Sequence, residues 1–132
     1  MSENFKLEIV NPEKSFLDRE DINQVVVPGY EGEIGILKDH ISIISFLKPG
    51  IIKVFSNNAE EKYYVEDGIL EFKENTLSIL TSYIKSLKDI DAKFIDKSIK
   101  EAEEEINKED IIDQKKFLLS QKIDILSSIS VN

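Results

Sequence analysis

The chain of 132 residues contains no cysteine and no tryptophan, and only one histidine and one arginine. Without cysteine it cannot form a disulfide framework, a thiolate nucleophile or a thiolate metal site. One histidine among scattered carboxylates supplies too few ligands for a zinc centre of the usual kind. These absences exclude several classes of enzyme before any motif is considered.

Positive charge is also scarce: 17 lysine and arginine residues face 26 aspartate and glutamate residues, for a formal net charge of −9. A chain this acidic repels phosphate backbones, so nucleic acid is not an expected partner. No apolar run approaches the ~18 residues that span a bilayer. The start, MSENFKLEIV, shows no basic segment followed by an apolar block, so no secretory signal is expected. The composition indicates a cytosolic protein or one peripheral to a membrane.

Glycine and proline are few, and all five glycines and all three prolines precede residue 69. Both residues mark turns, because glycine reaches positive φ easily and proline fixes φ. The segments between them show period-two alternation or β-branched enrichment, which predicts short strands. These segments are FKLEIV, INQVVV, EIGIL, ISIISFL, IIKVF, KYYVE, ILEF and TLSILT. Eight or more closely spaced strands predict an antiparallel β-sandwich or a flattened barrel.

From Ser86 the pattern becomes helical. Ile95, Ile99, Ala102 and Ile106 recur at helical spacing, and Asp89 or Asp91 is a suitable N-cap. The segment NKED interrupts the pattern at residues 107–110, and a second helix is predicted from about residue 111 to 129. Two helices with so short a connection should form an antiparallel hairpin. We therefore predict an α+β chain, with a β-sandwich domain at residues 1–85 and a helical hairpin at residues 86–132 that docks weakly.

Two lysines of the second predicted helix, Lys115 and Lys122, fall in the middle of its apolar arc. In one interpretation their stems lie along apolar surface while the ammonium groups reach water. In the other, this face meets an acidic partner, because stranding two lysines in a sealed core would cost several kcal/mol. The sequence leaves both open.

The stretch VPGYEGEIGIL holds three evenly spaced glycines with Glu31 and Glu33 between them. It does not have the dinucleotide-binding spacing, no helix follows it, and no P-loop sequence occurs, so phosphate binding is not expected. His40 has Asp39 and Ser42 nearby, but sequence neighbours rarely form a catalytic triad. The residues predict no enzyme activity.

The segment VPGYEGEIGILKDHISIISFLKPGIIKV, followed by DGILEFKENTLSIL, resembles the signature of the ATP synthase epsilon subunit family. The order of the glycine–glutamate turn, the histidine, the LKPG segment and the later GILE strand all agree, as does the trailing hairpin. The resemblance implies a sandwich of about ten strands and a non-catalytic subunit of the central rotor stalk. Such a subunit couples proton or sodium flow through a ring of c subunits to ATP synthesis at the bacterial inner membrane, on its cytoplasmic face, with membrane association only through the complex.

The resemblance also implies contacts for individual residues of this chain. The residues that would touch the polar loops of the c-ring are Tyr30, Glu31, Gly32 and Glu33. Those that would contact the gamma subunit are Asn11, Asp39 and His40. Those that would reach an acidic loop of the catalytic alpha and beta subunits, and so brake ATP hydrolysis, are Lys115, Lys116 and Lys122.

The first predicted helix departs from family members that bind ATP on the hairpin. Those members begin this helix with a pattern of the form I/L-D-x-x-R-A, whereas this chain has IDAKFI, with Phe94 and Ile95 in place of the arginine and alanine. The second helix has no arginine, and lysine does not replace a guanidinium fork. We expect no nucleotide, metal or other cofactor. The rival interpretation is a stand-alone β-sandwich adaptor or small-ligand binding module with a helical tail.

Overall fold

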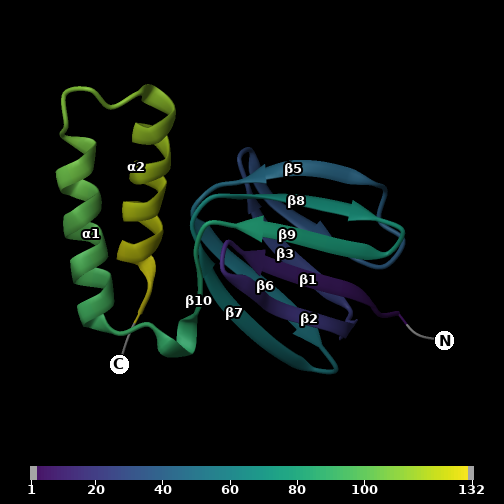
Figure 1. Ribbon diagram of the computed structural model, residues 1–132. Coiled ribbons are helices and arrows are strands. Elements are labelled where there is room, and N and C mark those ends of the chain that lie inside the picture. The colour runs from purple at the N-terminus through teal and green to yellow at the C-terminus, as the bar shows by residue number, and fades with distance from the viewer. Residues whose placement is uncertain (1–2, 131–132) are drawn as a thin grey trace.

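The computed structural model describes residues 3–130 and contains ten strands followed by a short 3-10 turn and two α-helices (Figure 1). The strands are β1 (Phe5–Asn11), β2 (Lys14–Ile22), β3 (Gln24–Gly29), β4 (Gly32–Ile36), β5 (Ile43–Leu47), β6 (Gly50–Ser56), β7 (Ala59–Val65), β8 (Gly68–Lys73), β9 (Thr76–Thr81) and β10 (Ile84–Ser86). The 3-10 turn is η1 (Leu87–Asp89), and the helices are α1 (Ala92–Ile106) and α2 (Asp113–Ser128). The predicted fold class, a β-sandwich of about ten strands with a helical hairpin, is confirmed.

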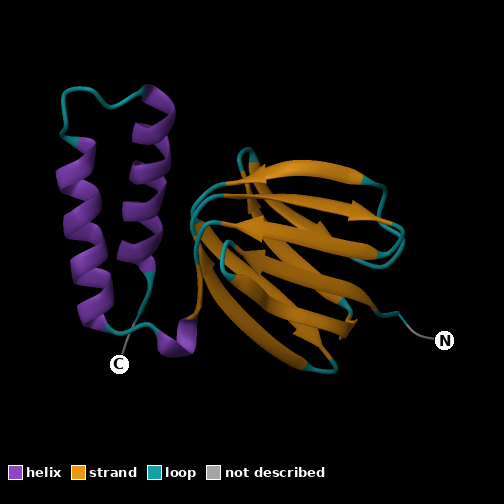
Figure 2. Cartoon of the chain, viewed as in Figure 1, coloured by secondary structure: helices purple, strands orange, loops and turns teal. Residues whose placement is uncertain are grey.

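The strands form one curled sheet (Figure 2). Their order is β10-β7-β6-β3-β5-β8-β9-β1-β2, with β4 paired to β3 off this path. The sheet folds over so that its inner face encloses the core. All pairs are antiparallel except β1 with β9, which are parallel from Lys6↔Thr76 to Val10↔Leu80. This parallel pair was not predicted from the sequence, because alternation within a strand carries no information about which strand lies beside it.

The core follows the alternation seen in the sequence. In β1 the side chains of Phe5, Leu7 and Ile9 are buried while their neighbours are partly exposed. The Phe5 ring meets the Phe72 ring of β8 edge-on, with centroids 5.7 Å apart. Each fully buried side chain of this kind contributes about 1.5–3 kcal/mol by leaving water.

Strand β2 is the main element that the sequence analysis missed. It has the sequence KSFLDREDI and only its last residue, Ile22, is fully buried. It lies at one end of the strand order and shows two irregularities in its pairing with β1. Charged, bulged and poorly alternating strands are typical of sheet edges, where such features prevent pairing with another chain. The polar composition of residues 14–22 therefore hides an edge strand.

The helical hairpin forms as predicted, within a few residues at each end. The Asp91 side chain caps α1 by accepting a hydrogen bond from the Phe94 backbone N–H at 2.8 Å. On the predicted apolar stripe of α1, Ile95 and Ala102 are buried. Helix α2 lies between α1 and the sandwich (Figure 1). None of the helices within residues 3–130 is long and apolar enough to cross a membrane.

An apolar cluster joins the hairpin to the sandwich. Its buried members are Tyr64 of β7, Ile90 of the linker, Ile95 of α1 and Leu126 of α2. Half-buried side chains surround it, and the rings of Tyr83 and Phe94 stack with centroids 6.1 Å apart. The hairpin is thus packed on the outside of the sandwich through a second core, separate from the first.

Candidate functional site

The glycine-rich stretch forms a tight turn between β3 and β4. Gly29 and Gly32 face each other across the strand pair, and Gly32 has φ +137°, a value that side-chain-bearing residues rarely adopt. A Cβ on Gly29 would come within 2.8 Å of the Gly32 carbonyl oxygen. Glycine at both positions permits this turn, so the two glycines set the shape of the projection.

The turn presents four exposed residues to solvent, namely Tyr30, Glu31, Gly32 and Glu33. No ion pair to Glu31 or Glu33 forms within residues 3–130. The sequence analysis predicted that these four residues touch a partner, and the structure brings them together at one tip. Two exposed carboxylates on this turn, without an ion pair inside residues 3–130, are suited to a polar partner.

Tyr30 connects the turn with two other parts of the molecule. Its ring centroid lies 6.2 Å from that of Phe46 on β5 and 5.6 Å from that of Phe117 on α2. All three side chains are large, apolar and exposed by more than a third. The turn, the sheet face and the docked hairpin therefore meet at one aromatic side chain.

An exposed row of apolar side chains crosses four strands, and the sequence analysis did not find it. Pairing in register places Phe46 of β5 beside Ile69 of β8, Ile69 beside Leu80 of β9, and Leu80 beside Val10 of β1. Their neighbours along each strand point into the core, so this set, which we call the apolar row, points outward. Phe46 is 61% exposed and Leu80 is 53% exposed. The sequence does show an apolar residue at the outward position of several strands. That these residues lie side by side becomes visible only when the register between the strands is known.

One step along the strands from the apolar row, the outward-facing residues become partly acidic. The row next to the apolar row is Ile44, Glu71, Ser78 and Glu8 in register. A hollow of about 440 Å³ lies over the two rows. Contiguous apolar surface with an acidic border is typical of a protein–protein interface.

The residues predicted to contact gamma lie near opposite ends of β1, rather than in one cluster. Asn11 ends β1, where its Oδ1 accepts hydrogen bonds from the N–H groups of Glu13 and Lys14, both at 3.1 Å. Asp39 lies near the start of β1, because its partner Asn75 accepts from the Lys6 N–H at 3.0 Å. A strand of seven residues is ~20 Å long, so a partner touching both ends must lie along the face.

Asp39 and His40 are held by hydrogen bonds of their own. The Asp39 N–H donates to Asn75 Oδ1 at 2.7 Å, and Asn75 Nδ2 donates back to Asp39 Oδ1 at 2.9 Å. His40 Nδ1 lies 2.7 Å from the Ile41 carbonyl oxygen, so Nδ1 carries the proton, and the ring packs edge-on against Phe72. Since Asp39 bonds Asn75 and not the imidazole, no catalytic relay exists at this loop.

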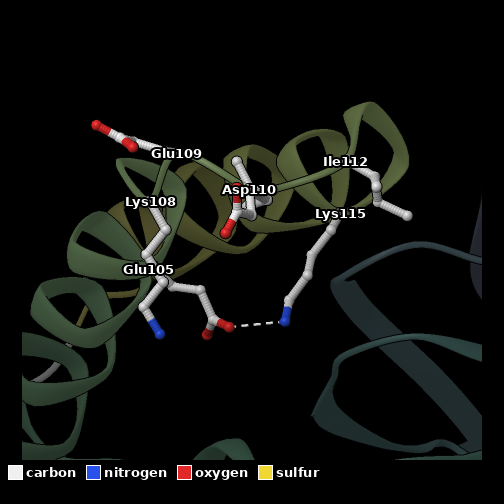
Figure 3. A pocket seen from close by; sticks show the side chains of 7 residues that line it. Glu105, Lys108, Glu109, Asp110, Ile112 and Lys115 are labelled. Carbon is white, nitrogen blue, oxygen red and sulfur yellow. Dashed lines mark ion pairs between the residues drawn. The ribbon is translucent and has the colours of Figure 1, made fainter.

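Two of the three lysines predicted to reach the catalytic subunits, Lys115 and Lys122, have acidic partners within the chain. Lys115 Nζ lies 2.7 Å from Glu105 Oε1, which joins α2 to α1 (Figure 3). This pairing lowers the pKa of the Glu105 carboxyl, first through the hydrogen bond from Lys115. Lys122 Nζ lies 2.9 Å from Glu66 Oε2, which joins α2 to the sandwich. Lys116 is exposed, and no ion pair to it forms among residues 3–130.

A hollow lies at the closed end of the hairpin, where the connection joins the two helices. It is lined by Glu105, Lys108, Glu109, Asp110, Ile111, Ile112 and Lys115 (Figure 3). These side chains come from the helix ends and their connection, and they carry charges of both signs. Within the described part of the chain, no three histidine, aspartate or glutamate side chains are grouped to hold a metal ion. The arrangement favours contact with other proteins.

Comparisons with known proteins agree with each other. Residues 4–86 match the family model described as ATP synthase, Delta/Epsilon chain, beta-sandwich domain. The chain is 63% identical over 130 residues to the ATP synthase epsilon chain of Pelagibacter ubique (strain HTCC1062), covering 98% of this chain and 100% of the relative. It is 38% identical over 121 residues to the sodium ion specific ATP synthase epsilon chain of Propionigenium modestum, covering 89% and 84% of the two chains.

Two solved structures share the fold. A chain in the cryo-EM structure of the Euglena gracilis mitochondrial ATP synthase (OSCP/F1/c-ring) has a TM-score of 0.75 at 20% identity, covering 96% of this chain and 79% of that one. A chain in the Tetrahymena thermophila central stalk/c-ring structure has a TM-score of 0.67 at 14% identity, covering 96% of both. At these identities the likeness concerns the fold alone.

Proposed function

The chain belongs to the ATP synthase delta/epsilon family, and from this premise we propose that it is a non-catalytic subunit of the central stalk. In this role it binds the gamma subunit and the c-ring, and it couples ion flow through the ring to ATP synthesis at the catalytic alpha and beta subunits. The observation that carries the proposal is the 63% identity to an ATP synthase epsilon chain over the relative's whole length. The complex holds the chain at the cytoplasmic face of the bacterial inner membrane.

We assign gamma binding to the face that carries the apolar row. The row is contiguous and exposed, and it runs from Phe46 of β5 to Val10 of β1. Asn11 follows Val10, whereas Asp39 and His40 lie towards the other end of the same strands. Leu80 is 53% exposed, so covering it would contribute about 1 kcal/mol, half of the value for a fully buried leucine. The hydrogen bonds of Asn11 and Asp39 keep the loops at both ends of the face in shape for the partner.

We assign c-ring contact to the turn between β3 and β4. Its shape comes from Gly29 and Gly32, and its chemistry comes from Glu31 and Glu33, which are exposed and free of ion pairs within residues 3–130. Exposed carboxylates of this kind suit the polar loops that the family resemblance implies.

We assign a regulatory role to the hairpin, as a brake on ATP hydrolysis that acts when it leaves the sandwich and reaches the catalytic subunits. The proposal treats residues 1–85 and 86–132 as two domains, supported by the family model, which ends at residue 86. Exposed Lys116 is available to an acidic partner, whereas Lys115 and Lys122 must first leave Glu105 and Glu66. Each exposed ion pair contributes only ~0.2–1 kcal/mol. These pairs therefore shift the equilibrium between the docked and the undocked hairpin without fixing it in either state.

The proposal is tested by co-expression with the gamma, alpha and beta subunits from the same operon. A tagged wild-type chain should retain all three, and Leu80→Asp should lower its affinity for isolated gamma at least tenfold, because a carboxylate would be buried in an apolar contact. Ile112→Asp is the matched control, since Ile112 is 66% exposed and lies outside the apolar row. Retention of no ATP synthase subunit by the wild type would favour the rival adaptor role. Equal affinity of both variants for gamma would refute the assigned face.

A further inference from the structure

Lys122 makes the ion pair that joins the hairpin to the sandwich. Its Nζ lies 2.9 Å from Oε2 of Glu66, in the connection between β7 and β8, and the two side chains are 20% and 26% exposed. The Tyr64 hydroxyl donates to the same Oε2 at 2.9 Å. Burial raises the pKa of Tyr64, with a further contribution from the Glu66 charge, so the hydroxyl keeps its proton and remains a donor.

The apolar cluster beneath the hairpin buries surface area, but it does little to fix the position of the hairpin on the sandwich. Leu126 and Ile95 are buried there, yet apolar contacts of this kind are non-directional and tolerate small displacements. A half-buried ammonium group has one favourable position, beside its carboxylate. Losing either partner leaves the other charge poorly solvated, which costs more than the net value of the pair.

We propose that Tyr64, Glu66 and Lys122 form a lock that holds the hairpin in its docked position, and that the hairpin leaves the sandwich only when this lock opens. The lock accounts for a lysine in the middle of the apolar arc of α2, because its partner lies on the sandwich. Its regulatory meaning rests on the proposed brake. When the hairpin leaves the sandwich, Lys122 becomes available to an acidic partner, and when the hairpin docks again, Lys122 pairs with Glu66.

A second ion pair made by a lysine of α2 provides an internal comparison. Lys115 and Glu105 join α2 to α1, so this pair travels with the hairpin and contributes nothing to docking. Both pairs involve a lysine of α2 and a glutamate, at 2.7 Å and 2.9 Å. They differ in whether the partner belongs to the sandwich.

The test measures opening directly in the full isolated chain. Because the chain has no cysteine, Leu126→Cys places a single thiol at a fully buried position under the hairpin, and its labelling rate by a thiol reagent reports the open fraction. In this background we expect Lys122→Gln to raise the rate about tenfold, equivalent to ~1.4 kcal/mol. Lys115→Gln should leave the rate within about twofold. Circular dichroism and the urea transition of the sandwich verify folding.

A charge exchange completes the design. Glu66→Lys and Lys122→Glu should each accelerate labelling, and the double variant should be slower than either, because the pair is restored in reverse. The lock is refuted if Lys122→Gln and Lys115→Gln label alike, or if the double variant is as fast as the faster single one. Since labelling needs no ATP synthase, a failure of the brake in the assembled enzyme would leave this result intact, and the two ideas are separately falsifiable.

Discussion

Arg19, the only arginine of the chain, is predicted to hold the two halves of the sandwich together. Its guanidinium donates from Nε and Nη2 to Asp21 at 2.8 and 2.6 Å, and from Nη1 to Glu61 of β7 at 2.6 Å. Nη2 also reaches the Ser56 hydroxyl of β6 at 2.9 Å. Strand β2 lies at one end of the strand order while β6 and β7 lie near the other, so Arg19 bridges strands that do not pair.

The loss of stability on removing Arg19 is limited, because its carboxylate partners are partly exposed to solvent. Hydrogen bonds to charged groups contribute about 1.5–3 kcal/mol when buried, but the Asp21 and Glu61 side chains are 45% and 36% exposed, so solvent screens them. We expect Arg19→Ala to lower the free energy of unfolding by about 1–2 kcal/mol at pH 7. Arg19→Lys should lose roughly half of that, because an ammonium group keeps the charge without the two-pronged geometry.

The effect should depend on pH in a defined direction. The hydrogen bond from Arg19 lowers the pKa of Asp21, and hydrogen bonds from Tyr63 and then Arg19 lower the pKa of Glu61. A carboxyl whose pKa is lower in the folded state than in the unfolded state stabilises the fold at pH values above its unfolded pKa, which is about 4. This stabilisation is lost as the pH falls through the lowered pKa of the folded state. The difference between wild type and Arg19→Ala should therefore shrink from pH 7 to pH 3.

Urea denaturation followed by circular dichroism at both pH values measures the difference, with Lys97→Ala as a control for an exposed pair within one helix. The reasoning fails if Arg19→Ala unfolds at the wild-type urea concentration at pH 7. It also fails if the loss is as large at pH 3 as at pH 7, since the carboxylates would then not be its source.

Three further predictions concern function. Replacing Glu31 and Glu33 with Lys should reduce ATP synthesis in membrane vesicles several-fold, while stability changes by less than about 0.5 kcal/mol; normal coupling with normal incorporation would contradict the c-ring assignment. Calorimetry of the isolated chain should show no saturable ATP binding, because this sequence has Phe94 where the family's ATP-binding pattern has arginine; binding at millimolar concentration or below would overturn this. Truncation after Ser86 should raise ATP hydrolysis by the assembled enzyme, and alanine at Lys115, Lys116 and Lys122 should raise it partly. An unchanged rate after truncation would exclude a brake.

Much of the fold was predictable because local chemistry and burial agree. Strand β1 alternates cleanly since one of its faces forms the core, and Asp91 caps α1 because a short carboxylate fits the exposed N–H groups of a first turn. The turn between β3 and β4 was predictable from its glycines, because few other residues adopt that backbone. In these elements the type of each residue matches the local burial or backbone conformation at its position.

The rest depends on which distant segments meet. Residues 14–22 look polar because β2 is an edge strand, and β10 has only three residues, too few for a periodic pattern. The apolar row exists only once four strands are in register. The partner of Lys122 is Glu66, in another element, and nothing in the local sequence around either residue identifies the other.

The parallel pairing of β1 with β9 has a consequence for synthesis of the chain. Val10 lies beside Leu80, so the first strand is made about 70 residues before the strand that flanks it. At 5–20 residues per second this interval lasts roughly 4–14 s. During that time β2 is the only one of the two strand partners of β1 that has been made, so the edge of β1 that later pairs with β9 stays unpaired. The polar, bulged β2 discourages pairing with another chain at its own outer edge, but the β9-facing edge of β1 is open to wrong partners until β9 is made.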